Sequence, residues 1–145
     1  MQSTFVLAPR WGTERDALQL HADMLYQLNL LWIRDTMRRG LRPPLRALSC
    51  EPPWCATPPR YVSHHGPQPI GRERDYFDGP QVFHIGEGTC IELASYDAAA
   101  ATLLELTPSR PIVECVRQRF HCYVRRDKDG ATLDSTSKGS TWQVS

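Results

Sequence analysis

Proline pairs in the middle of the chain limit the fold more than any other feature of the sequence. Eight of the 12 prolines lie between Pro43 and Pro69, and three adjacent pairs occur there. Proline lacks the backbone N–H that helices and central strands need, so residues 41–79 are predicted to form a proline-rich arm without helical or strand periodicity. The arm divides a single domain of 145 residues into an N-terminal helical region, 1–40, and a compact region, 80–145.

Residues 13–39 have the pattern of a long amphipathic helix. Thr13 is placed to act as the N-cap, and Gly40 is placed to end the helix. Apolar side chains recur at spacings of three and four residues, which predicts one broad apolar face. Its members are Ala17, Leu18, Met24, Leu25, Leu28, Leu31 and Trp32. This face is expected to be buried in the rest of the domain or against a neighbouring subunit.

The second half of the chain predicts one helix followed by an antiparallel sheet. The helix runs from Cys90 to Leu106 and ends before Pro108. A turn over residues 127–130 is typical of a hairpin between the last two of three strands. The predicted strands are Ile112–Arg117, Phe120–Arg126 and Ala131–Thr136. Together with the N-terminal helix they indicate the α+β class.

Composition limits the class of protein. Hydrophobic residues make up 41% of the chain, charged residues 23%, and the net charge is +1, which is typical of a globular protein and argues against general polyanion binding. No apolar run is long enough for a membrane span, and the pattern of Met1–Phe5 leads us to expect no secretory signal. The five cysteines fit no compact disulfide framework, so we expect reduced thiols inside a cell. Cys115 and Cys122 lie on strand faces and are expected in the core.

Two features suggest other kinds of binding. Arginines cluster around Asp35, and they fit a solvated face, an ion-paired subunit contact or a surface for nucleic acid. These arginines are Arg34, Arg38, Arg39, Arg42 and Arg46. Cys50 and Cys55, followed by His64 and His65, form part of a zinc pattern that nothing completes. A zinc-stabilised nucleic-acid-binding module is therefore a third hypothesis, and the expectation is no metal and no cofactor.

The segment Gly86–Ala94 carries the strongest chemical signal. Thr89 and Glu92 have the capping-box spacing, which makes Thr89 the N-cap and Cys90 the first helical residue. Unpaired N–H groups and the helix dipole at that position stabilise a thiolate, which is the nucleophilic form of cysteine. The preceding glycines allow a tight turn and leave room for a substrate backbone. An N–H group there is also placed to donate to an oxyanion.

A nucleophilic cysteine needs a base and a group that orients the base. In the strand Phe120–Arg126, His121 lies on the face opposite the apolar side chains. If the turn pairs Arg126 with Ala131, then His121 lies diagonal to Asp134 on the same face. Asp134 is then placed to hold the imidazole toward Cys90.

Three motifs in this order resemble the transglutaminase-like branch of the papain-like thiol enzymes, and in particular the small transglutaminase-like proteins of tailed bacteriophages. The motifs are Cys90-Ile91-Glu92-Leu93-Ala94, His121-Cys122-Tyr123-Val124 and Gly130-Ala131-Thr132-Leu133-Asp134-Ser135-Thr136. The resemblance implies a transglutaminase/papain-like core over residues 80–140. It also implies a nucleophile, a general base and an orienting carboxylate at Cys90, His121 and Asp134. Gln81 or His84 is then the candidate oxyanion side chain, and Thr89 supports the site.

Two functions follow from the resemblance. The first is a phage-encoded thiol hydrolase or acyl transferase, associated with the virion or its assembly, that acts on peptide or isopeptide amides. The second is a non-catalytic virion structural protein in a head–tail joint, neck or tail. The expected partners are other virion proteins or further copies of the chain, bound through the N-terminal helix and the proline-rich arm. The expected location is the host cytoplasm during assembly and then the virion.

Overall fold

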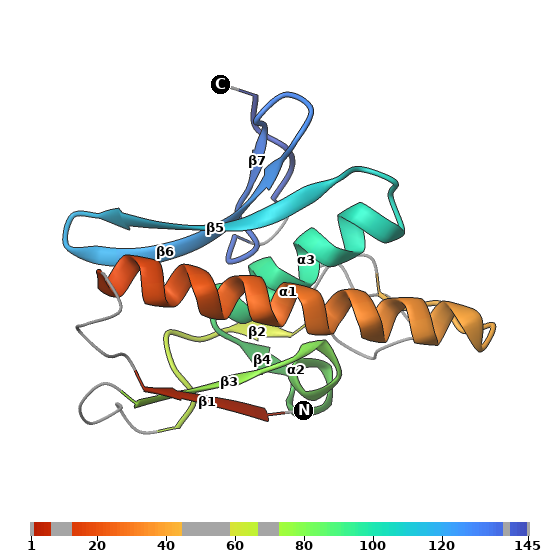
Figure 1. Cartoon of the computed structure of the whole chain (residues 1–145), viewed down its shortest axis with the longest axis horizontal. Coiled ribbons are helices and arrows are strands. Elements are labelled where there is room, and N and C mark those ends of the chain that lie inside the picture. Colours follow the sequence, from red (N-terminus) through yellow and green to blue (C-terminus); the bar gives the residue numbers. More distant parts are fainter. Residues whose placement is uncertain (1, 7–12, 45–58, 67–72, 138–139, 145) are drawn as a thin grey trace.

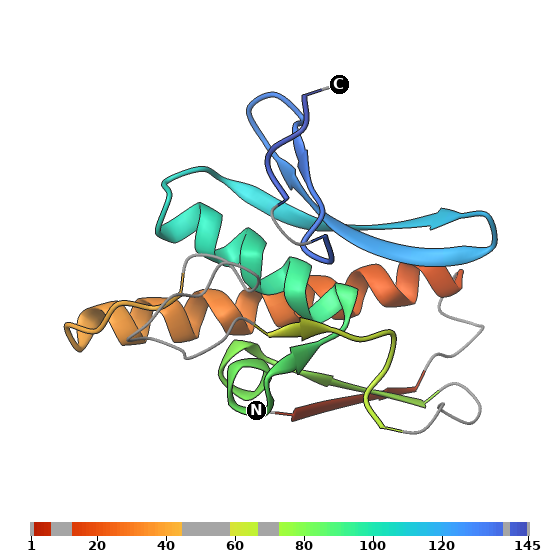
Figure 2. The ribbon, with the colours of Figure 1, turned by 180° about the vertical axis from the view of Figure 1, so that it is seen from behind.

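The chain folds into three layers in the part that the computed structural model describes, which is residues 2–6, 13–44, 59–66, 73–137 and 140–144. Figure 1 shows a three-stranded sheet on one side and two helices in the middle layer. A short helix and two small two-stranded sheets lie on the other side, and Figure 2 shows the same order from behind. This mixture of helices and mostly antiparallel strands confirms the α+β class.

The long N-terminal helix, α1 (Glu14–Arg38), confirms the prediction for residues 13–39. The Thr13 hydroxyl caps its first turn by accepting the Asp16 N–H at 3.2 Å. At the other end Gly40 adopts a φ of 77°, a left-handed conformation that favours glycine, and begins the turn that closes the helix.

The apolar face of α1 is buried within the domain. Leu18, Leu25 and Ile33 lie in the core. The pattern also predicts Met24 and Leu31 on this face, but in the structure these two residues are 45% and 62% exposed. The face that packs on the other elements is rotated away from them and includes polar side chains instead. These are His21, Asn29 and Thr36.

The central helix, α3 (Cys90–Leu103), is buried almost along its whole length. One core cluster packs between α3, the first half of α1 and the large sheet, and a second packs between α3 and the second half of α1. The helix ends before the predicted Leu106 because the chain turns back there. Leu106 has a φ of 52°, and the Thr107 N–H donates to the Ala101 carbonyl oxygen at 2.8 Å.

The large sheet has the antiparallel order β5 (Ser109–Val116), β6 (Arg119–Arg126) and β7 (Thr132–Leu133). The Arg126 N–H donates to Ala131 at 2.8 Å, which confirms the predicted pairing at the hairpin turn. The predicted strand 131–136 is wrong beyond Leu133, since the Asp134 carboxylate accepts hydrogen bonds from the Thr136 N–H at 3.0 Å and the Thr136 hydroxyl at 2.7 Å. These bonds turn the chain away from β6.

The hairpin of β5 and β6 extends beyond the start of α1 (Figure 1). Its two-residue turn, Arg117-Gln118, has φ values of 50° and 64°. Cys122 lies in the core as predicted, whereas Cys115 is exposed, which corrects the prediction. By the alternation along β5, the Cys115 side chain lies on the face of the sheet that packs on the helices. At this position, however, β5 extends beyond the ends of the helices, so no helix covers Cys115.

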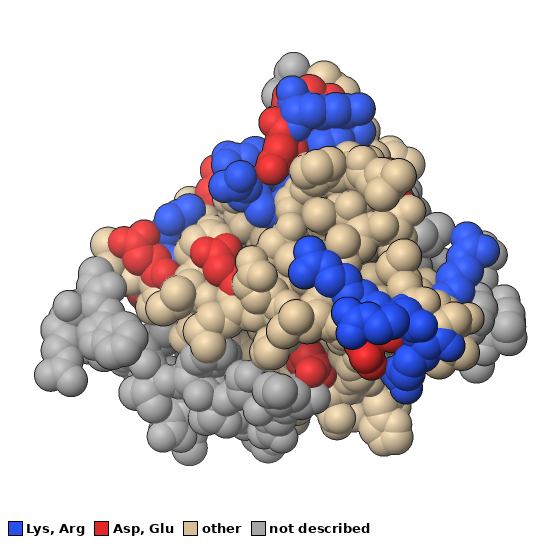
Figure 3. All heavy atoms as spheres, turned by 45° about the vertical axis from the view of Figure 1, so that its right-hand side comes forward, with Lys and Arg blue, Asp and Glu red and all other residues tan. Residues whose placement is uncertain are grey.

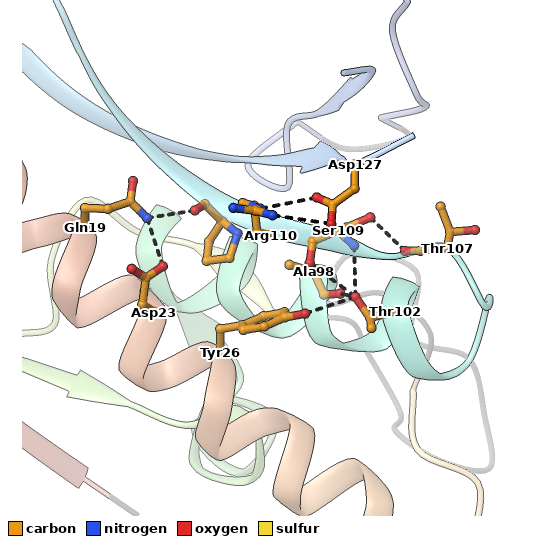
Figure 4. Close-up of polar contacts among 10 residues, drawn as sticks. Gln19, Asp23, Tyr26, Ala98, Thr102, Thr107, Ser109, Arg110 and Asp127 are labelled. Carbon is orange, nitrogen blue, oxygen red and sulfur yellow. Dashed lines mark hydrogen bonds and ion pairs between the residues drawn. The ribbon is translucent and has the colours of Figure 1, made fainter. Parts of the chain in front are cut away.

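Side chains of α1 cover the free edge of β5. Gln19 accepts the Val113 N–H at 2.8 Å and donates to the Pro111 carbonyl oxygen at 2.8 Å, so its amide stands in for a neighbouring strand. Arg15 donates to the Val113 carbonyl oxygen at 2.8 Å. Figure 4 shows Gln19 bridging to β5 and, further along α1, Tyr26 reaching Thr102 of α3. These contacts fix α1 against the sheet.

Parts of the predicted proline-rich arm form regular structure. Strand β3 (Glu73–Phe77) pairs antiparallel with β1 (Gln2–Val6), and β2 (Arg60–Tyr61) pairs in parallel with β4 (Glu87–Gly88). The expectation of an arm without strands is therefore wrong for β2 and β3. Both strands are short and free of proline, and their partners are distant in sequence, so local periodicity gives no signal for them. Pro52 and Pro53 lie outside the described residues.

Candidate active site

Cys90 stands at the first position of α3, where the sequence predicts it. The Thr89 hydroxyl accepts the Glu92 N–H at 3.5 Å, and the Glu92 carboxylate accepts the Thr89 N–H at 2.8 Å. This capping box confirms the predicted start of the helix. It also engages the Thr89 hydroxyl, so Thr89 positions the turn that carries Cys90.

His121 and Asp134 form an ion pair at the end of the large sheet. The distance between His121 Nε2 and Asp134 Oδ1 is 3.2 Å, and both side chains are partly exposed. Since Asp134 occupies Nε2, the imidazole keeps Nδ1 for a second partner. Burial raises the pKa of Asp134, but hydrogen bonds from Thr136 and the charge of His121 outweigh burial and leave that pKa below its usual value.

Strand β6 lies next to the cysteine, because Cys90 packs against the core cluster that contains Cys122. The residue after His121 is Cys122, whose backbone N–H faces the Cys90 thiol. Cys90 and His121, both in the described part of the chain, share no hydrogen bond. A catalytic hydrogen bond often tightens only when substrate binds, so the lack of a hydrogen bond between Cys90 and His121 is compatible with catalysis.

The thiol environment differs from the one expected for a helix N-terminus. Burial raises the pKa of the Cys90 thiol, while the backbone N–H groups of Cys122 and Ile91 act in the opposite direction and Asp134 adds to the rise. The helix start alone predicts a lowered pKa. A reactive Cys90 therefore depends on proton transfer to a partner base.

The glycines before Cys90 serve the fold. Gly86 ends α2 (Gly79–Ile85) with a φ of 79°. A Cβ atom on Gly88 would lie 2.9 Å from Leu93 and 3.1 Å from Val82, whereas one on Gly86 would meet nothing within 4 Å. The prediction of room for a substrate backbone is therefore wrong at Gly88, where core side chains fill the space.

The other candidate support residues lie on α2. The Gln81 N–H donates to Asp78, the N-cap of α2, at 3.4 Å. His84 lies in the last turn of the same helix and is exposed. No hydrogen bond joins either side chain to Cys90 in the described structure. Gln81 and His84 therefore stay predictions as oxyanion donors.

Sequence reasoning missed a buried contact next to the site. His65 Nε2 lies 2.5 Å from Glu92 Oε1, and its ring packs on Phe77 with centroids 4.6 Å apart. The second Glu92 oxygen accepts the Phe77 N–H at 2.5 Å. The hydrogen bond that His65 donates to the Glu92 carboxylate raises the pKa of His65, against the effect of burial. The pair fastens the segment after β2 to the start of α3.

Among the described residues, no group of three His, Cys, Asp or Glu side chains is placed to hold a metal ion. Cys50 and Cys55 of the zinc pattern lie outside those residues. His65, also part of that pattern, is engaged by Glu92.

Basic side chains gather on the face shown in Figure 3. The exposed arginines at the end of α1 and just after it are Arg34, Arg38, Arg39 and Arg42, and Arg46 lies outside the described residues. Arg39 pairs with Asp35 at 3.2 Å. The ion pair removes part of the positive charge from the predicted patch.

No protein-family model, curated protein or solved structure gives a significant match to this chain. None of the described helices combines the length and the apolar character that crossing a membrane requires.

Proposed function

We propose that this chain is a transglutaminase-like Cys-His-Asp protein, associated with a phage virion or its assembly, that hydrolyses or transfers acyl groups of peptide or isopeptide amides. The observation that carries the proposal is the His121–Asp134 pair, 3.2 Å apart, which joins β6 to the residue after β7, while Cys90 packs against the core cluster that contains Cys122 of β6. A transglutaminase/papain-like core accounts for a cysteine at a helix start packed against an antiparallel sheet. The phage association rests on the sequence motifs.

The proposed reaction uses all three residues. His121 takes the thiol proton of Cys90, and the thiolate sulfur bonds to the carbonyl carbon of the amide. The carbon–nitrogen bond then breaks, and His121 returns the proton to the leaving amine. Water or a second amine attacks the thioester and frees Cys90. Asp134 keeps Nε2 of the imidazole engaged, so Nδ1 is the nitrogen that exchanges the proton.

Burial of the thiol favours a second function. Because burial raises the pKa of Cys90, the thiol is inert unless the gain from an imidazolium partner exceeds that effect. An inert thiol fits the non-catalytic alternative, a virion structural protein that uses the fold for assembly. Contact with other virion proteins, further copies or nucleic acid is then the function, and it uses surfaces such as the exposed residues of α1.

The first test is iodoacetamide labelling of the native protein against pH, followed cysteine by cysteine by mass spectrometry. Cys115 is an internal control because it is exposed on the same chain. We expect Cys90 to label at a lower pH than Cys115. His121→Ala should move Cys90 labelling to higher pH, and Asp134→Asn should move it part of the way.

Cys90→Ala provides the folding control. Alanine is tolerated in the first turn of a helix, so the variant should keep the circular dichroism spectrum of the wild type and lose all thiol activity. If native Cys90 labels only above the pH at which Cys115 labels, or does not label, the catalytic proposal fails. The structural alternative then stands.

A further inference from the structure

The segment that crosses the start of α3 places a tyrosine at the candidate thiol site. Strand β2 pairs with β4 so that Tyr61 lies opposite Gly88, two positions before Cys90. The Arg60 N–H donates to the Gly86 carbonyl oxygen at 2.9 Å, and the Val62 N–H donates to the Gly88 carbonyl oxygen at 3.0 Å. Backbone hydrogen bonds on both sides therefore fix the position of Tyr61.

A side-chain contact holds the same segment further along. His65 bonds to the buried Glu92 carboxylate at 2.5 Å, and Glu92 lies one turn into the helix that begins at Cys90. Tyr61 thus belongs to a strap, residues 60–66, that is bonded at one end to Gly86 and Gly88, just before α3, and at the other end to Glu92 of α3. Tyr61 itself is 42% exposed, so a molecule in solution can reach its side chain.

The Tyr61 hydroxyl is a candidate hydrogen-bond donor at this site. Burial raises the pKa of this hydroxyl, and the negative charges of Cys90 and Asp134 raise it further. The phenol therefore stays protonated at neutral pH, and the register of β2 and β4 places Tyr61 beside the turn that leads to Cys90. A protonated phenol is a hydrogen-bond donor.

The site lacks an assigned side-chain donor for an oxyanion. The Thr89 hydroxyl is engaged in the capping box, and Gln81 has no hydrogen bond to Cys90 in the described structure. We propose that Tyr61 is a further catalytic residue, whose hydroxyl donates a hydrogen bond to the carbonyl oxygen of an acyl substrate as Cys90 attacks it. This inference rests on the proposed function and adds the residue that binds the developing oxyanion.

The backbone supplies a second donor. The N–H groups in the first turn of a helix have no partner within the helix, and the Ile91 N–H faces the Cys90 thiol. In the proposed reaction this N–H and the Tyr61 hydroxyl would both donate to the oxygen on the attacked carbon. Loss of one such donor typically reduces a rate by about 100-fold or more in a closed site. Because Tyr61 is partly exposed, we expect removal of its hydroxyl to reduce the acylation rate roughly tenfold or more.

Two reagents distinguish whether Tyr61 donates to the oxyanion or only packs beside the thiol. p-Nitrophenyl acetate acylates a thiolate: the sulfur–carbon bond forms, an oxyanion develops, and p-nitrophenolate leaves with the electron pair of the broken carbon–oxygen bond. Iodoacetamide alkylates the same thiolate at a CH2 group with loss of iodide and develops no oxyanion. Only the first reaction should use the Tyr61 hydroxyl.

The experiment compares Tyr61→Phe with the wild type in both reactions at Cys90, measured by mass spectrometry. The phenylalanine keeps the ring and removes only the hydroxyl. We expect acylation to slow roughly tenfold or more while alkylation stays within about twofold. Tyr123→Phe is the matched control, because Tyr123 is a partly buried tyrosine near Glu114 and Arg125, and both of its rates should match the wild type.

The outcomes distinguish a failure of the Tyr61 assignment from a failure of the proposed thiol function. If Tyr61→Phe leaves acylation unchanged, or slows acylation and alkylation equally, the assignment of Tyr61 is wrong while the reactive thiol stands. If wild-type Cys90 reacts with neither reagent, the proposed function fails and the role of Tyr61 fails with it. Faster acylation in the variant would also overturn the assignment.

Discussion

The carboxylate of Glu92 does more than cap α3, because it joins three segments that are distant in sequence. It accepts the Thr89 N–H at 2.8 Å and the Phe77 N–H at 2.5 Å, and it pairs with His65. The Glu92 side chain is fully buried, so losing a partner leaves charge in an apolar environment. The His65 imidazole therefore holds the far end of the strap, while backbone hydrogen bonds to Gly86 and Gly88 hold its start.

Replacing His65 should weaken the protein in a pH-dependent way. Glu92 raises the pKa of His65 in the folded state, so the pair stabilises the fold fully below the unfolded pKa of about 6.5. That stability is lost as the pH rises through the folded pKa. His65→Leu should therefore cost about 3 kcal/mol at pH 6 and less at pH 9, measured by urea denaturation.

His65→Gln is the conservative control for this prediction. Its side-chain amide can still donate to Glu92 but does not titrate, so the variant should recover part of the stability at pH 6. The stability difference between His65→Gln and His65→Leu should be the same at both pH values. A His65→Leu deficit that is equal at pH 6 and pH 9 would contradict a charged pair.

Among single residues, the sequence predicted local chemistry and missed contacts made through the fold. Thr89, Cys90 and Glu92 lie within four consecutive positions, so their capping geometry follows from spacing. His65 reaches Glu92 across 27 positions, and no local pattern indicates that contact. Cys115 has the right alternation for the core, but the helices end before they reach it.

At the scale of elements, α1 both packs on the sheet and completes its edge. Gln19 supplies one acceptor and one donor to β5, each at 2.8 Å. Gln19→Leu should leave the Val113 N–H and the Pro111 carbonyl oxygen without partners. We expect a loss of about 2 kcal/mol in the free energy of unfolding, measured by chemical denaturation.

Gln19→Glu tests the two halves of this contact. A carboxylate can accept the Val113 N–H but cannot donate to the carbonyl oxygen of Pro111. Its stability should fall between the wild type and Gln19→Leu. If Gln19→Leu is as stable as the wild type, the amide does not serve as part of the sheet.

Long elements with strong periodicity were predictable, and short ones were not. The start of α1 follows from Thr13 and its end from Gly40, and the hairpin turn of β6 and β7 follows from Gly130. Helix α2 spans only Gly79–Ile85, too few residues for an apolar period. The turn Arg117-Gln118 adopts left-handed conformations with residues that do not favour them, so its sequence carries no signal.

At the scale of the whole molecule, α1 contributes to both core clusters and so couples the large sheet to α3. Leu25 is fully buried in the cluster beneath the sheet. Leu25→Ala should therefore reduce stability by about 3 kcal/mol. Hydrogen exchange should show the same loss of protection in the amides of β6 as in those of α1, because both open in one cooperative step.

Leu31→Ala is the matched control on the same helix. Leu31 is 62% exposed, so its truncation should change stability by less than about 0.5 kcal/mol. If Leu25→Ala destabilises α1 while the amides of β6 keep their protection, the helix and the sheet are separate cooperative units. The site between them would then not be held by a common core.

The place of α1 in the chain also affects how the protein is made. This helix leaves the ribosome before the elements that cover its apolar face, α3 and β5, which end only at Leu103 and Val116. At a synthesis rate of about 5–20 residues per second, the nascent helix waits on the order of ten seconds for its partners. During that interval Leu18, Leu25 and Ile33 are exposed to water, so the newborn chain is a substrate for chaperones until its last third emerges.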